Sequence, residues 1–132
     1  MRKIIVLIAI ATLGACTHHQ KQLPDYSTDS TRQIDQYGYS PDNPIRVGDG
    51  SVKNGPRNEI IFLSSLRGPN GESIIFKRLG SCCAFETPNG YRGAGLLDKY
   101  EVSYEGLTQP KILYINMYDP GEIIPPEGFT LY

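Results

Sequence analysis

The sequence predicts an α+β fold, in which one short helix packs on a small, mainly antiparallel β-sheet that follows a flexible tether. Residues 55–66 carry apolar side chains at helical spacing, which predicts the helix. Residues 97–105 alternate between apolar and polar side chains, and residues 112–118 form a nearly continuous apolar run. Residues 17–43 contain only one leucine and one isoleucine, too few to offset the entropy of ordering that segment.

The helix is predicted from a start signal, an apolar stripe and a stop signal. Pro56 stands near the first helical position, where the missing N–H of proline costs nothing, and a Gly-Pro pair at positions 68 and 69 ends the helix. The side chains expected to face the sheet are Ile60, Ile61, Leu63 and Leu66.

Strands are predicted at residues 73–79, 82–86, 97–105 and 112–118, with a last edge strand at 128–132. Turn residues at 87–90 separate the second strand from the third, and those at 106–110 close a hairpin. Tyr100, Val102 and Tyr104 lie on one face of their strand, which predicts that this face is buried. The run at 112–118 is typical of a central strand covered on both faces.

The N-terminal residues are typical of an export signal. Arg2 and Lys3 precede an apolar segment at residues 4–11, which is shorter than the roughly 20 residues that span a bilayer. The tetrapeptide that follows resembles the cleavage site of bacterial lipoprotein signals: Leu13-Gly14-Ala15-Cys16. Cys16 is therefore the predicted lipid attachment site and the first residue of the mature chain.

Lipidation at Cys16 would hold the chain on a membrane, since each buried methylene contributes about 0.8 kcal/mol. Thr17, rather than Asp, follows the cysteine, which resembles the sorting signal for the outer membrane of Gram-negative bacteria. The chain is accordingly divided into a signal peptide at residues 1–15, a lipidated cysteine and flexible linker at 16–43, and a domain at 44–132. The expected location is the periplasmic face of the outer membrane.

The charge of the chain predicts no nucleic-acid partner. There are 13 Lys and Arg against 14 Asp and Glu, and loss of Arg2 and Lys3 with the signal moves the formal charge from −1 to −3. Basic patches, the usual signature of nucleic-acid binding, are absent from the sequence. The expected partners are the membrane, through the lipid anchor, and an envelope protein.

Cys82 and Cys83 are the cysteines that remain once Cys16 is lipidated. Three states are open to them: two structural free thiols, a vicinal disulfide, or a redox or metal-binding pair. Neighbouring side chains on a strand point to opposite faces, which favours free thiols, whereas an oxidising compartment favours the disulfide. The spacing is not Cys-x-x-Cys and residues 44–132 lack histidine, so we expect no metal and no cofactor.

Arg78, Arg92 and Asp119 are the candidate ligand-binding residues. The two arginines are placed at the loop region from Gly80 to Gly95, where they can bind an anion or pair with a carboxylate. The candidate carboxylates are Glu86, Asp98, Glu101, Asp119 and Glu122. Structural pairing is the expected outcome. No catalytic residue is predicted, because a serine or cysteine triad needs a base and the domain has no histidine.

Two segments resemble a family of small bacterial envelope lipoproteins of unknown function, over about residues 43–131. They are residues 78–90, with the element Gly80-Ser81-Cys82-Cys83, and residues 97–102 taken together with 113–119. Members often carry the label 2-dehydro-3-deoxyphosphooctonate aldolase. That enzyme resembles a TIM barrel of about 250 residues, which a domain of about 90 cannot close, so we expect no aldolase activity.

The sequence thus predicts a non-enzymatic lipoprotein that acts as an accessory or assembly module of the cell envelope. The alternative is a small periplasmic enzyme, redox or ligand-binding module that uses residues 80–95.

Overall fold

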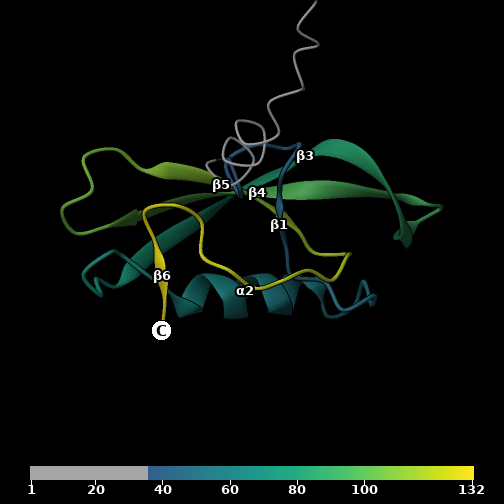
Figure 1. The fold of residues 1–132 in the computed structure, drawn as a ribbon. Helices are drawn as coiled ribbons and strands as arrows, with labels where there is room; N and C mark the ends of the chain where they lie inside the picture. The colour runs from purple at the N-terminus through teal and green to yellow at the C-terminus, as the bar shows by residue number, and fades with distance from the viewer. Residues whose placement is uncertain (1–35) are drawn as a thin grey trace, which may run out of the picture.

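The computed structural model describes residues 36–132, which form one helix and two β-sheets (Figure 1). The larger sheet has the strand order β1-β5-β4-β3, with β1 parallel to β5 and the other pairs antiparallel, and the smaller sheet pairs β2 with β6. This architecture confirms the predicted α+β class. In chain order the elements are β1 Ile45–Arg46, α2 Gly55–Ser65, β2 Leu66–Arg67, β3 Ile74–Tyr91, β4 Ala94–Tyr104, β5 Lys111–Asn116 and β6 Thr130–Leu131.

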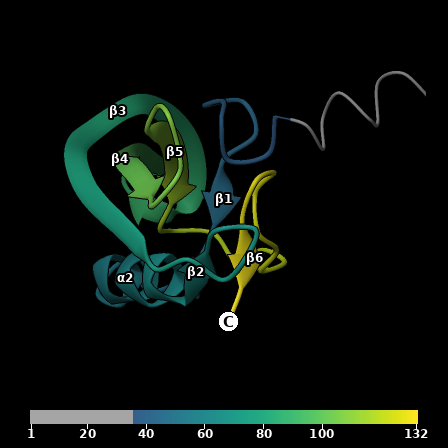
Figure 2. The ribbon, with the colours of Figure 1, turned by 90° about the vertical axis from the view of Figure 1, so that its left-hand side faces the viewer.

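The hairpin of β3 and β4 makes up most of the larger sheet, and β3 curls around β4 and β5 (Figure 2). The predicted strands at 73–79 and 82–86 are one strand of 18 residues. Its pairing with β4 is shifted at three places, between Arg78 and Gly80, Cys82 and Ala84, and Glu86 and Tyr91. Such bulges bend a strand and increase its twist, which explains the curl. The predicted turn at 87–90 is wrong, because the chain reverses after Tyr91.

Helix α2 begins at Gly55, with Pro56 in its first turn as predicted, and its buried face includes Leu63 of the expected stripe but not Ile60 or Ile61. Glu59, Phe62 and Leu63 are buried, and Leu66 continues this set directly after the helix. These positions follow the spacing i, i+3, i+4 and i+7 of a single helix face. Ile60 and Ile61 are 45% and 56% exposed, so their assignment to the sheet-facing stripe was wrong.

The core lies between α2 and the inward face of the larger sheet. Tyr100 and Val102 of β4 are buried there, as the alternation predicted, and Tyr104 packs against them half-buried. Leu113 and Ile115 have no exposed surface, in agreement with the interior position of β5 in the sheet. The remaining buried members of this cluster are Ile45, Val47, Phe62, Leu63, Leu66 and Phe129.

Residues 36–43 contact the domain, although the sequence assigned them to the linker. The N–H of Tyr114 donates to the carbonyl of Gly38 over 2.8 Å, and Tyr37 and Tyr39 pack against the core. Gly38 has a φ of +80°, and a Cβ there would lie 2.8 Å from the side chain of Ile45. The predicted signal peptide, Cys16 and the linker up to residue 35 lie outside the described residues.

Candidate functional site

Cys82 and Cys83 are joined by a disulfide, which was one of the alternatives that the sequence left open. Cys83 has a φ of +51° and lies between two paired positions, since Cys82 is opposite Leu97 and Ala84 is opposite Leu96. Alternation of side chains, the argument for free thiols, fails here because Cys83 is the extra residue of a bulge. Cys83 is exposed and Cys82 is half-buried.

Arg78, on the same strand, forms a two-pronged ion pair with Asp98 of β4. Its Nε and Nη2 donate to the two carboxylate oxygens of Asp98 over 2.9 and 2.7 Å. The Oγ of Ser81, which directly precedes the disulfide, accepts from Arg78 over 2.7 Å and donates to Asp98 over 2.6 Å. Hydrogen bonding to the Asp98 carboxylate raises the pKa of Arg78. These contacts join β3 to β4 next to the bulged cysteine pair.

Glu59 extends the polar network from the sheet to α2. The hydroxyl of Tyr100 donates to its Oε2 over 2.8 Å, while its Oε1 has no hydrogen-bond partner. Only 1% of Glu59 is exposed, and this burial raises its pKa to about 7. The hydrogen bond from Tyr100 lowers this pKa in part, and the negative charge of Asp98 raises it. Burial and the contact with Glu59 also raise the pKa of Tyr100.

The five residues of this polar network, Glu59, Arg78, Ser81, Asp98 and Tyr100, run from the buried side of α2 to the exposed side of β3. At its inner end a carboxyl group can take up or release a proton near neutral pH. At its outer end the half-exposed Arg78 side chain and Ser81 meet the solvent beside the disulfide. The network therefore links a titratable group in the core to the surface around Cys82 and Cys83.

The three predicted ligand-binding residues do not come together. Arg78 is paired with Asp98, whereas Arg92 lies in the turn after β3, with its guanidinium carbon 5.6 Å from the ring centre of Tyr91. The paired positions run from Ala94 at the turn to Tyr100 opposite Arg78, so about 20 Å of strand separates the two arginines.

Asp119 lies in the loop after β5, apart from both arginines. Its carboxylate accepts hydrogen bonds from the hydroxyl of Thr87 and from the side-chain amides of Asn89 and Asn116, each amide over 2.9 Å. These hydrogen bonds lower the pKa of Asp119 against the opposing effect of its burial. Asp119 thus ties the irregular end of β3 to this loop.

The sequence reasoning missed Glu59, Ser81 and Tyr100, and it named Asp98 only as one of five carboxylates that could pair with the arginines. A signal was present for Glu59, which shares its helix face with Phe62 and Leu63 and is therefore a carboxyl in an apolar stripe. Asp98 carries a similar signal, because it shares the parity of the inward-facing Tyr100 and Val102. Sequence spacing offered no signal that these groups meet Arg78, since that contact depends on the register of the hairpin.

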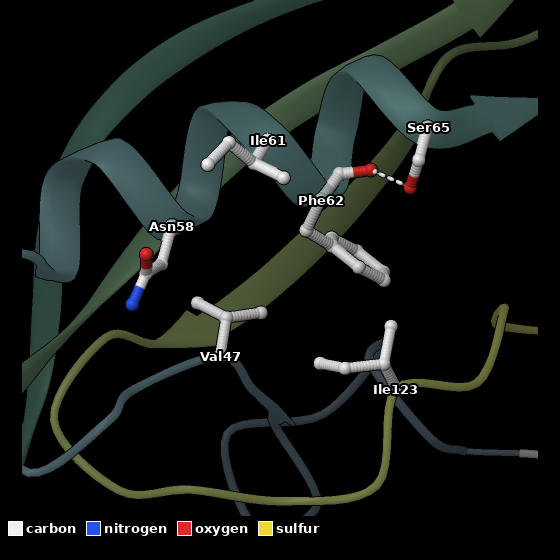
Figure 3. A pocket seen from close by; sticks show the side chains of 6 residues that line it. All are labelled: Val47, Asn58, Ile61, Phe62, Ser65 and Ile123. Atoms are coloured by element: carbon white, nitrogen blue, oxygen red, sulfur yellow. Dashed lines mark hydrogen bonds between the residues drawn. The ribbon is translucent and has the colours of Figure 1, made fainter.

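A groove of about 220 Å³ lies between α2 and the segment that follows β5 (Figure 3). Ile61 and Ile123 border it and are about half exposed, and the Ser65 hydroxyl donates to the carbonyl of Phe62 over 2.7 Å at one end. The residues of this groove, which we call the α2 groove, are Val47, Asn58, Ile61, Phe62, Ser65 and Ile123.

Within residues 36–132, no group of three or more His, Cys, Asp or Glu side chains is placed to hold a metal ion. The same part of the chain contains no helix with the length and apolarity that a membrane crossing requires. No protein-family model, no curated protein and no solved structure matches the chain.

Proposed function

We propose that the chain is a lipoprotein, anchored through Cys16 in the outer membrane and facing the periplasm, and that it belongs with the small envelope lipoproteins it resembles. The observation that carries the proposal is the run Leu13-Gly14-Ala15-Cys16 directly after the apolar residues 4–11. A cysteine at this point supplies the thiol to which the lipid is attached. The domain then serves as a non-enzymatic accessory or assembly module of the envelope.

The length of chain between anchor and domain limits where the module acts. Twenty residue steps separate Cys16 from Gln36, where the described domain begins. Even fully extended, such a segment spans at most about 70 Å. The domain consequently searches a shell close to the membrane, which raises its effective concentration toward partners in the same membrane.

The α2 groove supports a protein partner for this module. Its volume of about 220 Å³ lies below the range of about 300–1,000 Å³ that is typical of small-molecule sites. The bordering Ile61 and Ile123 are exposed apolar side chains, which suit the apolar anchor residues of a protein partner. We infer that an envelope protein inserts apolar side chains at this groove.

The anchor is tested by separating the membrane and soluble fractions of cells that produce the Cys16→Ala variant. We expect this variant to lose its acyl chains and leave the membrane fraction, because the thioether cannot form. The double variant Cys82→Ser/Cys83→Ser is the matched control and should remain in the membrane. Thr17→Asp should move the protein to the inner membrane. A Cys16→Ala protein that stays membrane-bound would contradict the proposal.

The partner site is tested separately with a photo-reactive residue at position 61, and with the same residue at the exposed Glu105 as control. A membrane protein should be captured from position 61 only, and Ile123→Glu should abolish that capture by placing a charge at the groove. Equal capture from both positions, or capture that survives Ile123→Glu, would rule out the α2 groove as the binding surface.

A further inference from the structure

The disulfide lies where a reductant can reach it. Strand β3 is one of the two edge strands of the larger sheet, and within it Cys83 is exposed and Cys82 half-buried. Leu96 of β4 is paired with Ala84, the residue that follows Cys83, and is 47% exposed. An exposed apolar side chain therefore lies at the strand position next to the cysteine pair. Structural disulfides that are protected from reduction are usually buried in the core; this one is on the surface.

The backbone at Cys83 depends on the disulfide. Cys83 has a φ of +51°, in the left-handed region that residues other than glycine rarely adopt. Neighbouring residues of a regular strand direct their side chains to opposite faces, so two adjacent cysteines can bond only where the strand is irregular. The bulge between Cys82 and Ala84 supplies that irregularity. Without the sulfur–sulfur bond, the left-handed backbone at Cys83 loses the link that requires it.

We propose that Cys82 and Cys83 form a thiol–disulfide exchange site, which accepts two electrons from a dithiol and whose reduction releases the bulge at Cys83. This inference is independent of the lipid anchor and of the α2 groove. The substrate class is a dithiol, carried by a small molecule or by a protein with two neighbouring cysteines.

The exchange proceeds in two steps. A thiolate of the dithiol attacks the exposed Sγ of Cys83, the Sγ–Sγ bond breaks, and Cys82 leaves as a thiolate. The second thiol of the reductant, as a thiolate, then attacks its own partner sulfur in the mixed disulfide and releases Cys83. The dithiol is oxidised to a disulfide, the cysteine pair is reduced, and the two protons lost by the reductant's thiols pass to Cys82 and Cys83.

Release of the bulge changes the contacts around it. Ser81 directly precedes the cysteine pair and hydrogen-bonds to Arg78 and Asp98, so a shift of register at Cys83 moves Ser81 away from these two partners at the outer end of the polar network. The altered segment is bounded on both sides, because Arg78 remains opposite Tyr100 and Asp119 holds the far end of β3 through Thr87. The structural response to reduction is therefore confined to the middle of the hairpin.

The experiment uses the full chain, purified in detergent without reductant and then exposed to dithiothreitol under native conditions. Free thiols are alkylated after acid quench, and trypsin cleavage after Arg78 and Arg92 isolates residues 79–92, which contain both cysteines and exclude Cys16. We expect no label before reduction and two labels after it. Amide hydrogen exchange should accelerate at residues 80–86 and 95–99 on reduction and stay unchanged in β5.

Two variants separate the effect of the disulfide from that of the neighbouring Ser81 hydroxyl. Cys82→Ser/Cys83→Ser should show the exchange pattern of the reduced protein with or without dithiothreitol. Ser81→Ala, which removes the neighbouring hydroxyl and leaves the disulfide, should still respond to dithiothreitol. If the double variant does not fold, the reaction of the unmodified protein with dithiothreitol tests the proposal by itself. Two free thiols before reduction, resistance to dithiothreitol until the protein unfolds, or reduction without any change in exchange would each overturn the proposal.

Discussion

At the scale of single residues, Glu59 is a carboxyl group held almost entirely out of water. It is buried on α2, one of its oxygens has no partner, and its pKa is raised to about 7. Removal of its proton places a second negative charge near Asp98 in a region with little water to solvate it. The protonation state of Glu59 therefore affects how firmly α2 is held against β4.

Glu59 should make the folded state less stable as the pH rises from about 4.5 to 7. In this window the unfolded chain, with an ordinary carboxyl pKa of 4.5, loses the proton while the folded protein keeps it. The expected loss is on the order of 3 kcal/mol. Glu59→Gln stays neutral and should remove this slope, which urea unfolding at pH 5, 6, 7 and 8 measures.

Glu86→Gln is the control for that series, because Glu86 is an exposed carboxyl on β3. It should follow the pH dependence of the unmodified protein. Parallel slopes for the unmodified protein and for Glu59→Gln would show that the buried carboxyl does not hold a proton near neutral pH.

At the scale of elements, α2 and β3 were both expected from the sequence, but the buried face of α2 and the length of β3 were not. The helix was predicted in the right place, yet its inward face carries Glu59 and Phe62 while Ile60 and Ile61 point away. Periodicity identifies a helix, but two overlapping apolar faces leave the choice of the buried one to the packing. Strand β3 runs through both predicted strands and through the predicted turn at 87–90, and its pairing with β4 is shifted at bulges along the way.

Because α2 is buried on one face only, truncations at positions 61 and 62 should lower the free energy of unfolding by different amounts. Phe62→Ala should lower the free energy of unfolding by about 3–5 kcal/mol, because Phe62 is 3% exposed and its removal leaves a cavity. Ile61→Ala should cost about 1 kcal/mol or less, because that side chain is more than half in water. Denaturant unfolding of both variants makes the comparison, and equal losses would place Ile61 in the core after all.

At the scale of the whole molecule, the domain includes residues that composition assigned to the tether. Tyr37 and Tyr39 pack on the core, and their hydroxyls donate to the carbonyls of Glu122 and Glu127 in the C-terminal segment. Burial raises the pKa of Tyr39 to about 12, so its hydroxyl stays protonated as a donor. These contacts join residues 37–39 to the C-terminal segment of the chain.

Tyr39→Ala should destabilise the domain by about 2–3 kcal/mol, somewhat less than loss of a fully buried aromatic ring. Tyr39→Phe keeps the ring and should cost only about 1 kcal/mol, the value of one hydrogen bond. Thermal unfolding of the full chain in detergent gives both numbers. If Tyr39→Ala unfolded at the same temperature as the unmodified protein, residues 36–43 would lie outside the cooperative unit.

The sequence by itself determined the α+β class, the position of α2, the inward face of β4 and the interior place of β5. Each of these follows from the local period of apolar side chains, which neighbouring residues carry without help from the rest of the chain. Only the tertiary structure decided which face of α2 is buried, the disulfide between Cys82 and Cys83, and the meeting of Arg78, Asp98, Tyr100 and Glu59. The buried face of α2 is chosen by packing, because two apolar faces of the helix overlap. The disulfide and the network depend on the register of β3 and β4, where one added residue reverses the side-chain faces that a local pattern predicts.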